Sequence, residues 1–323
     1  MLPFDLRNYF SSFAAVADNV IYALIGIFCI LIFATIVVML LKKIKPDGNF
    51  SELQSRVQSW WVMVFIFTAA MVFSKTISIV FFGLLSFMAL KEFLSIIPTR
   101  KSDRSVLFWA YVTIPLQYYW IYIEWYGMFI VFIPVYAFLF LPMRMVLTGE
   151  TKDFLKSAGM IHWGVMTTVF SIGHIGFMLV LPKSGNPAAG GPGLVLFLVF
   201  LTQFNDVLQF VWGKMFGKNK IVPSVSPKKT WEGFFGGVFT TTILAYFIHP
   251  YLTPFTEWQG ALAGLFIAAG GFLGDITISA LKRDLGIKDS GSILPGHGGI
   301  LDRIDSLVFT APIFFHYVYY LHY

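Results

Sequence analysis

The sequence predicts an all-α, polytopic integral membrane protein with about ten transmembrane helices. Of its 323 residues, 57% are hydrophobic and 18% are aromatic, while only 12% are charged. This composition is too apolar for an ordinary soluble domain. The connections between the apolar stretches are short, so the chain is expected to form one membrane domain.

Ten apolar stretches approach or reach the roughly 20 residues that a spanning helix needs. In chain order they are residues 20–41, 59–74, 76–97, 105–123, 126–146, 159–181, 191–213, 232–250, 259–281 and 304–321. The helices of residues 1–190 contain few ionisable groups. The helices of residues 191–323 border connections that are more polar, so any chemistry is expected in this second part.

The basic residues test the helix count independently, because Lys and Arg collect in cytoplasmic loops. With both chain ends outside, the inner connections hold nineteen of the 23 basic residues and the outer segments three, while Lys91 lies within a span. This bias supports ten spans. The net charge of +6 is spread over several loops rather than one face, which indicates a membrane surface and no nucleic-acid partner.

Asp275 lies inside a predicted span, where an acid persists mainly if it faces a polar cavity, a partner or an ion. Ser279, Lys282 and Arg283 follow it at spacings of four, seven and eight, so all four share one helical face. The alternative is a helix end whose two basic side chains extend to the headgroup layer.

Asp302 and Asp305 lie three residues apart within the stretch LPGHGGILDRIDS, residues 294–306. On a helix they would share a face and repel each other unless a cation neutralises them. Oxygen ligands favour a hard cation such as Mg²⁺. The alternative is that the two acids cap the positive end of a helix.

The same stretch contains His297, Gly298 and Gly299. Glycines before a helix can present backbone N–H groups to an anion, although glycine turns are also common. His297 fits an acid/base, a phosphate donor or an ordinary loop residue equally well.

Other polar residues give weaker signals. Lys228 and Lys229 suit either a leaflet anchor or, with the neighbouring Ser226, a triphosphate site. Glu92 beside Lys91 is interpreted as a neutralised pair, and His174 as a packed, hydrogen-bonded side chain; both are left out of the predicted site.

Together these residues predict a cytoplasm-facing cavity suited to Mg²⁺-assisted phosphoryl or nucleotidyl transfer to a lipid. A transporter or channel is the rival interpretation, but it predicts polar residues at mid-membrane in both halves. A scaffold protein would leave the carboxylates unexplained.

The stretch that begins at Gly274 resembles the signature of the phosphatidate cytidylyltransferases, or CDP-diacylglycerol synthases. The matching residues are Ser279, Lys282, Arg283, Lys288, Asp289, Gly291, Leu294, Pro295, His297, Gly298, Gly299, Asp302, Arg303 and Asp305. The stretches SPKKTWEGFFGG and ND followed by GKMFGK are similar to upstream motifs of the same family, so the resemblance covers roughly residues 200 to 310.

This resemblance implies transfer of CMP from CTP to phosphatidic acid with a divalent metal, at the cytoplasmic face of a bacterial plasma (inner) membrane. It implies catalytic roles for Asp275, Asp302, Asp305, Lys282 and Arg283, of which the three aspartates would hold Mg²⁺. It implies substrate-binding roles for Asp206, Ser226, Lys228, Lys229, Ser279, Lys288, Asp289, His297, Gly298, Gly299 and Arg303. A different lipid phosphate, a second cation and a homodimer stay open.

Overall fold

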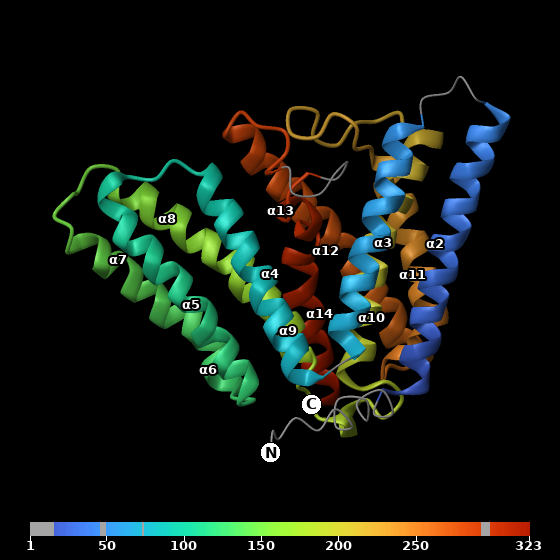
Figure 1. Ribbon diagram of the computed structural model, residues 1–323, viewed down its shortest axis with the longest axis horizontal. Helices are drawn as coiled ribbons and strands as arrows, with labels where there is room; N and C mark the ends of the chain where they lie inside the picture. The colour runs from blue at the N-terminus through green and yellow to red at the C-terminus, as the bar shows by residue number, and fades with distance from the viewer. Residues whose placement is uncertain (1–15, 46–49, 73, 292–297) are drawn as a thin grey trace, which may run out of the picture.

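The computed structural model is a bundle of long helices and describes residues 16–45, 50–72, 74–291 and 298–323 (Figure 1). Within these ranges every named element is helical, and extended backbone pairs in an isolated bridge between Lys220 and Thr230. The predicted all-α class is therefore confirmed.

Six helical segments of the described chain are long and apolar enough to cross a membrane. They are α2 (Asp18–Ile44), α3 (Ser51–Val72), α4 (Lys75–Ile96), the segment formed by α6 (Tyr126–Val131), π-helix η3 (Phe132–Ala137) and α7 (Phe138–Val146), α10 (Gly190–Phe216) and α12 (Glu257–Asp284). The chain is thus a polytopic integral membrane protein.

The other predicted spans coincide with helices that are not counted among these six by length and hydropathy. These helices are α5 (Arg104–Tyr122), α8 (Phe154–Val165) with π-helix η4 (Met166–Phe170) and α9 (Ser171–Met178), α11 (Trp231–Leu252), and α14 (Leu307–His322) with the short α13 (Leu301–Ile304) before it. The count of ten crossings is not confirmed and stays a prediction.

Connections with predicted basic, cytoplasmic character lie at one end of the bundle. Figure 1 shows the α4–α5, α7–α8 and α10–α11 connections and α13 at this end, whereas the C-terminus and the start of α2 lie at the other. The side chains that are candidates for chemistry, on α12 and α13, therefore lie at the same end as the basic connections.

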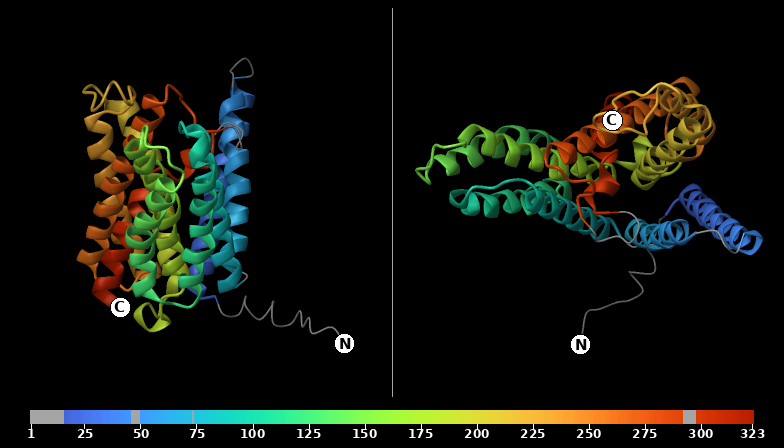
Figure 2. Two further views of the ribbon diagram at one scale, coloured as in Figure 1. Left: turned by 90° about the vertical axis from the view of Figure 1, so that its left-hand side faces the viewer. Right: turned by 90° about the horizontal axis from the view of Figure 1, so that it is seen from above.

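Helices from both parts of the sequence interleave. In Figures 1 and 2, α4, α9 and α14 stand in the middle, α5 to α8 extend to one side, and α2, α3 and α10 to α12 lie on the other. One hydrophobic cluster includes Phe93 and Val165 together with Leu194, Ile304 and Phe314. The division of the chain into residues 1–190 and residues 191–323 stays a prediction.

Glycines let the helices of the second part approach closely, as small residues do in membrane bundles. A Cβ atom added to Gly264 of α12 would lie 3.1 Å from Thr242 Cα of α11. A Cβ on Gly274 would collide with the Asp305 carbonyl and lie 3.1 Å from Ser306 Cα. The backbone of α12 therefore touches the α13–α14 junction one residue before Asp275.

Candidate active site

Three carboxylates from separate helices form what we call the carboxylate cluster: Asp206 of α10, Asp275 of α12 and Asp305 at the α13–α14 junction. The negative charge of Asp275 acts on both Asp206 and Asp305, and that of Asp206 acts on Asp305. Each acid therefore lies close enough to the others to repel them. Like charges held together in this way favour a bound cation or cationic side chain.

Cationic side chains surround the carboxylate cluster and offset part of this repulsion. Lys229 Nζ lies 2.6 Å from Asp275 Oδ2 and also stacks over the Phe272 ring, 4.7 Å from its centroid. The positive charges of Lys229 and Arg303 act on Asp206, and the charge of Lys282 acts on Asp305. The structure thus brings predicted metal-binding and phosphate-binding side chains into one region.

Two hydroxyls orient the acids. Ser279 Oγ donates to Asp275 Oδ1 at 3.1 Å, which agrees with the prediction that the two residues share one helical face. Ser306 Oγ donates to Asp206 Oδ2 at 3.0 Å, and the Ser306 amide donates to Asp305 Oδ1 at 2.8 Å. Ser306 links two of the three carboxylates, and sequence reasoning did not select it.

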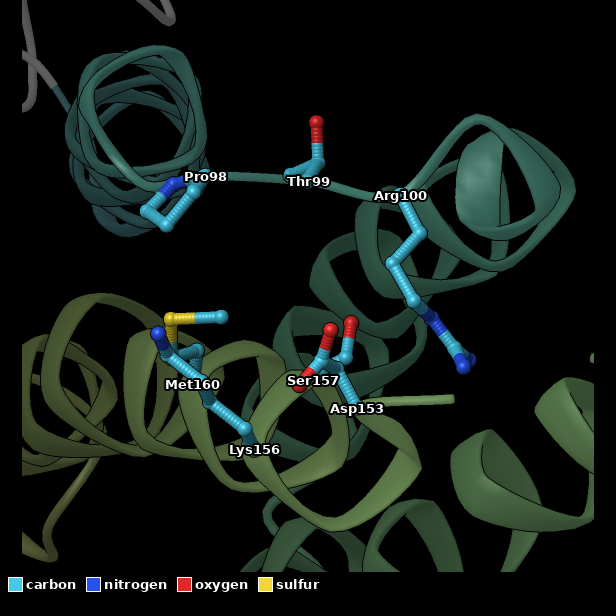
Figure 3. Close-up of a pocket in the computed structure, with 7 residues that line it drawn as sticks. All are labelled: Pro98, Thr99, Arg100, Asp153, Lys156, Ser157 and Met160. Carbon is cyan, nitrogen blue, oxygen red and sulfur yellow. The ribbon is translucent and has the colours of Figure 1, made fainter. Parts of the chain in front are cut away.

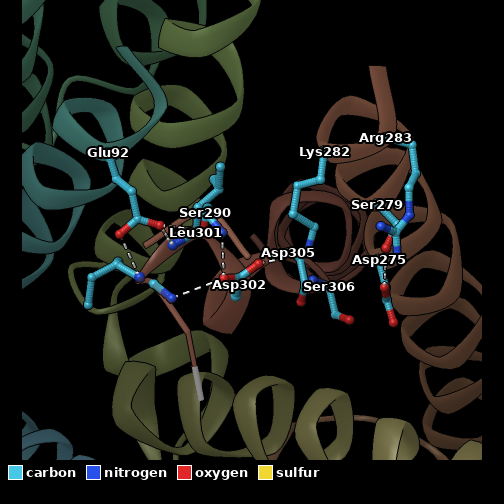
Figure 4. Close-up of polar contacts among 12 residues, drawn as sticks. Glu92, Asp275, Ser279, Lys282, Arg283, Ser290, Leu301, Asp302, Asp305 and Ser306 are labelled. Carbon is cyan, nitrogen blue, oxygen red and sulfur yellow. Dashed lines mark hydrogen bonds and ion pairs between the residues drawn. The ribbon is translucent and has the colours of Figure 1, made fainter. Parts of the chain in front are cut away.

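Asp302 has different partners from Asp305 (Figure 4). Its Oδ1 lies 2.6 Å from Lys282 Nζ, and its Oδ2 accepts the amides of Ser290 and Gly299, each at 2.9 Å. Burial acts to raise the pKa of the Asp302 carboxyl, but the hydrogen bond from Lys282, the two amides and the Lys282 charge outweigh it and hold the pKa below its usual value of 3.8. Asp302 is thus a fully hydrogen-bonded carboxylate.

Glu92, near the end of α4, reaches the same segment from the first part of the chain. Its Oε2 accepts the Ile300 amide at 2.8 Å, and its Oε1 accepts the Leu301 amide at 2.9 Å and the Ser290 hydroxyl. The interpretation of Glu92 as a pair with Lys91 was wrong, because Glu92 is buried with these partners and Lys91 is exposed. His174, in contrast, is confirmed as a packed side chain bonded to the Phe170 carbonyl.

The backbone amides after the glycines are occupied by the protein's own carboxylates. The amides of Gly299, Ile300 and Leu301 donate to Asp302 and Glu92. Gly298 has a φ of +78°, and a Cβ there would collide with the Asp302 carboxylate. The anions at this turn are the side chains of Asp302 and Glu92, and the predicted substrate-binding role of Gly298 and Gly299 stays a prediction.

The remaining predicted residues lie at the edge of this region or beyond it. Arg283 is exposed and donates from Nε to the Val225 carbonyl at 3.2 Å, which joins α12 to the basic connection. Ser226 is half-buried, whereas Lys228, Lys288 and Asp289 are exposed. His297 lies outside the described residues.

The donor chemistry of the carboxylate cluster fits Mg²⁺, because all three acids offer oxygen ligands. Among the described residues, however, no three His, Cys, Asp or Glu side chains converge closely enough to form a ready-made metal site. Asp302 already binds Lys282 and accepts two backbone amides. The predicted metal roles of Asp275, Asp302 and Asp305 stay predictions.

A separate hollow of about 140 Å³ lies between the α4–α5 connection and the start of α8 and is lined by residues including Arg100, Lys156 and Ser157 (Figure 3). Arg100 binds Asp103 through Nε and Nη2, both at 2.7 Å. Burial acts to raise the pKa of Asp103, but the hydrogen bonds from Arg100 and Ser157 and the Arg100 charge outweigh it and hold the pKa below 3.8. This hollow contains none of the predicted site residues.

Comparison with known proteins identifies the enzyme family of this chain. The model of the cytidylyltransferase family matches residues 54–321. The chain therefore belongs to the cytidylyltransferase family, an enzyme family of nucleotidyltransferases, and the resemblance is confirmed. The rival interpretations as a transporter or a scaffold have no support from this match.

Individual relatives differ in how much of the chain they cover. The chain is 44% identical over 298 residues to the uncharacterized protein YnbB of Escherichia coli (strain K12), covering 92% of this chain and 98% of that protein. It is 43% identical over 140 residues to the phosphatidate cytidylyltransferase of Mycobacterium bovis, covering 42% of each protein. It is 46% identical over 114 residues to that of Synechocystis, covering 35% of this chain and 39% of the relative.

Proposed function

We propose that this protein transfers CMP from CTP to phosphatidic acid, forming CDP-diacylglycerol and pyrophosphate at the cytoplasmic face of a bacterial plasma membrane. The observation that carries the proposal is the grouping of Asp206, Asp275 and Asp305 with Lys229 and Lys282, in the region that bears the family's signature. Relatives named phosphatidate cytidylyltransferase support the choice of substrates.

The reaction needs charge neutralisation more than a strong base. A lipid phosphate is already ionised at neutral pH, so one of its oxygens can attack the α-phosphorus of CTP directly. A new P–O bond forms there, the bond from the α-phosphorus to the bridging oxygen breaks, and pyrophosphate leaves with its electron pair. Negative charge builds on the transferred phosphoryl group and on the leaving group, and preorganised cations stabilise it.

Lys229, Lys282 and Arg283 are the side chains that we assign to this stabilisation. Lys229 is bound to Asp275 and Lys282 to Asp302, so each is held in place before substrate binds. Asp275 and Asp305 would hold Mg²⁺, with Asp206 beside them. When bound, the metal would neutralise the phosphates of CTP.

The location of the acids near one end of the bundle suits a lipid acceptor. A lipid phosphate lies at the membrane surface, and the basic connections at this end would attract both an anionic headgroup and CTP. The positive-inside bias supports a cytoplasmic orientation, where CTP is available.

The test is direct. The full-length protein, purified in detergent, should convert CTP and phosphatidic acid to CDP-diacylglycerol and release pyrophosphate when Mg²⁺ is present, and product should be lost when EDTA removes the metal. Absence of any CTP-dependent lipid product would contradict the proposal.

A different lipid phosphate is the second candidate acceptor. The relatives named for phosphatidate cover less than half of the chain, so they leave the acceptor open, and YnbB, which covers most of the chain, is uncharacterized. Competition among lysophosphatidate, phosphatidate and isoprenyl phosphate in one assay would identify the acceptor by the highest kcat/KM.

A further inference from the structure

One buried acid is not used by the proposed reaction. Glu92 is 6% exposed and lies on α4, far in sequence from the signature segment that it contacts. It accepts hydrogen bonds from the Ser290 hydroxyl and the amides of Ile300 and Leu301. These donors lie on both sides of residues 292–297 in the chain.

An ionised carboxylate is costly to bury unless hydrogen bonds replace its lost water. Glu92 receives three such bonds, and two of them come from successive backbone amides at the start of α13. Those amides have no partner within their own helix, because the first turn of a helix lacks intrahelical acceptors. The carboxylate and the helix start therefore satisfy each other.

The glycines of the signature are shaped around this carboxylate. A Cβ atom on Gly299 would collide with Glu92 Oε1 and lie 2.6 Å from Oε2, and a Cβ on Gly291 would lie 3.0 Å from Oε2. Neither residue has a positive φ. Close packing of Glu92, rather than backbone conformation, thus explains both glycines.

The same short segment carries the reactive groups. Gly299 and Ser290 also donate to Asp302, which binds Lys282, and α13 leads directly to Asp305. A displacement of the start of α13 would move Asp305 relative to Asp275 on α12. Misplacement of about 1 Å in a catalytic group can reduce the rate roughly 100-fold.

We propose that Glu92 is a positioning residue of the active site: it fixes the start of α13, and through it Asp302 and Asp305, from the first part of the chain. This inference rests on the proposed function. The family signature lies in residues 191–323 and does not include α4, whereas this inference gives α4 a role in the active site.

The first experiment separates kcat from KM in purified Glu92→Gln and Glu92→Ala proteins. Glu92→Gln keeps the size of the side chain but turns one acceptor into a donor, so kcat should fall about tenfold, and Glu92→Ala should lower it about 100-fold. The KM for CTP should change less than about threefold, because Glu92 is buried and its hydrogen bonds are to the protein itself. Lys91→Gln, at the exposed neighbouring position, should match the wild type.

A second measurement does not depend on activity. In Glu92→Ala, hydrogen exchange of the amides in residues 299–302 should become at least about tenfold faster, while exchange in α10 stays unchanged. Unchanged exchange would show that Glu92 does not hold this segment. Faster exchange with wild-type kcat would reduce Glu92 to a structural contact and overturn the positioning role.

A double-mutant cycle tests the packing. Gly299→Ala alone should lower kcat about 100-fold by pushing into the Glu92 carboxylate. The three atoms nearest to the added Cβ all belong to the Glu92 carboxyl group and are absent in the Glu92→Ala background, so the methyl should cause less than about threefold further loss there. Independent, multiplying losses would contradict the proposal.

Failure of the two ideas can be told apart. If wild-type protein makes no lipid product, the proposed function fails, and the exchange experiment still tests whether Glu92 holds α13. If the wild type is active and both Glu92 variants match it, only the positioning role fails. Ser290→Ala, which removes one hydrogen bond, serves as the milder variant should Glu92→Ala not fold, with kcat expected to fall about threefold.

Discussion

Two neighbouring groups of acids lie at the same end of the bundle and differ in how their charge is compensated. Glu92 and Asp302 each accept three hydrogen bonds or ion pairs from amides, Ser290 and Lys282. The carboxylate cluster of Asp206, Asp275 and Asp305 instead contains acids whose charges act on one another.

This difference in charge compensation indicates that the two groups of acids have separate roles. A carboxylate whose bonds are complete holds its surroundings in place, because each bond that breaks reduces the compensation of a buried charge. Carboxylates that repel one another reduce stability unless something binds between them, and this is the usual mark of a functional site. Lys282 connects the two groups electrostatically, since it binds Asp302 and its charge acts on Asp305.

The largest expected effect comes from breaking the Lys282–Asp302 ion pair, whose side chains are 12% and 6% exposed. Lys282→Met leaves the Asp302 charge buried and should lower the free energy of unfolding by about 3–5 kcal/mol. Denaturant titration in detergent measures this loss. Adding Asp302→Asn should recover part of the stability, and no recovery would show that the two residues do not act as a pair.

Asp305→Asn should reduce kcat by about 100- to 1,000-fold, because it removes a preorganised charge at the reacting groups. Unlike Lys282→Met, it should leave the unfolding free energy unchanged or raise it, since one repelling charge is lost. Asp284→Asn, at an exposed acid at the end of α12, is the control. A marked loss of stability in Asp305→Asn would erase the distinction between the two groups.

The Arg100–Asp103 pair lies away from both groups and tests whether a fully bonded acid affects stability alone. Because the pKa of Asp103 is held below 3.8, the pair stabilises the protein fully above about pH 4 and loses this contribution as the pH falls through the lowered pKa. Asp103→Asn should lower the unfolding free energy by about 1–3 kcal/mol at pH 7 and by less near pH 3. CTP kinetics at pH 7 should match the wild type.

The smallest expected effect is that of Ser306→Ala. It removes the hydroxyl that donates to Asp206 while the Ser306 amide still donates to Asp305. Loss of one such bond costs about 1 kcal/mol, so kcat/KM should fall roughly fivefold. A loss as large as that of Asp305→Asn would mean that Asp206 takes a direct part in the reaction.

Short-range patterns in the sequence predicted much of the site. The spacing of four between Asp275 and Ser279 predicted that they share a helical face, and in the structure the two side chains are hydrogen-bonded. The family signature located Asp302, Asp305 and Lys282. It did not predict that Asp302 and Asp305 bind different partners, because that depends on the break between α13 and α14.

Glu92 could not be found in this way. Its partners are about 200 residues away in the chain, with sequence separations of 198 to 209, and no local pattern carries that information. The sequence did contain one physical signal, because an acid within a span is costly to bury and needs a partner. The neighbouring Lys91 suggested the wrong partner, because successive residues on a helix point in different directions.

By itself, the sequence determined the all-α membrane class, the end of the bundle where chemistry is expected, and the family, because hydropathy, basic-residue bias and motif spacing act over one helix or one loop. Only the tertiary structure decided which acids repel, which are fully bonded, and that α4 holds the start of α13. Those outcomes depend on which helices pack together, and burial makes each unpaired charge costly enough to determine its partner.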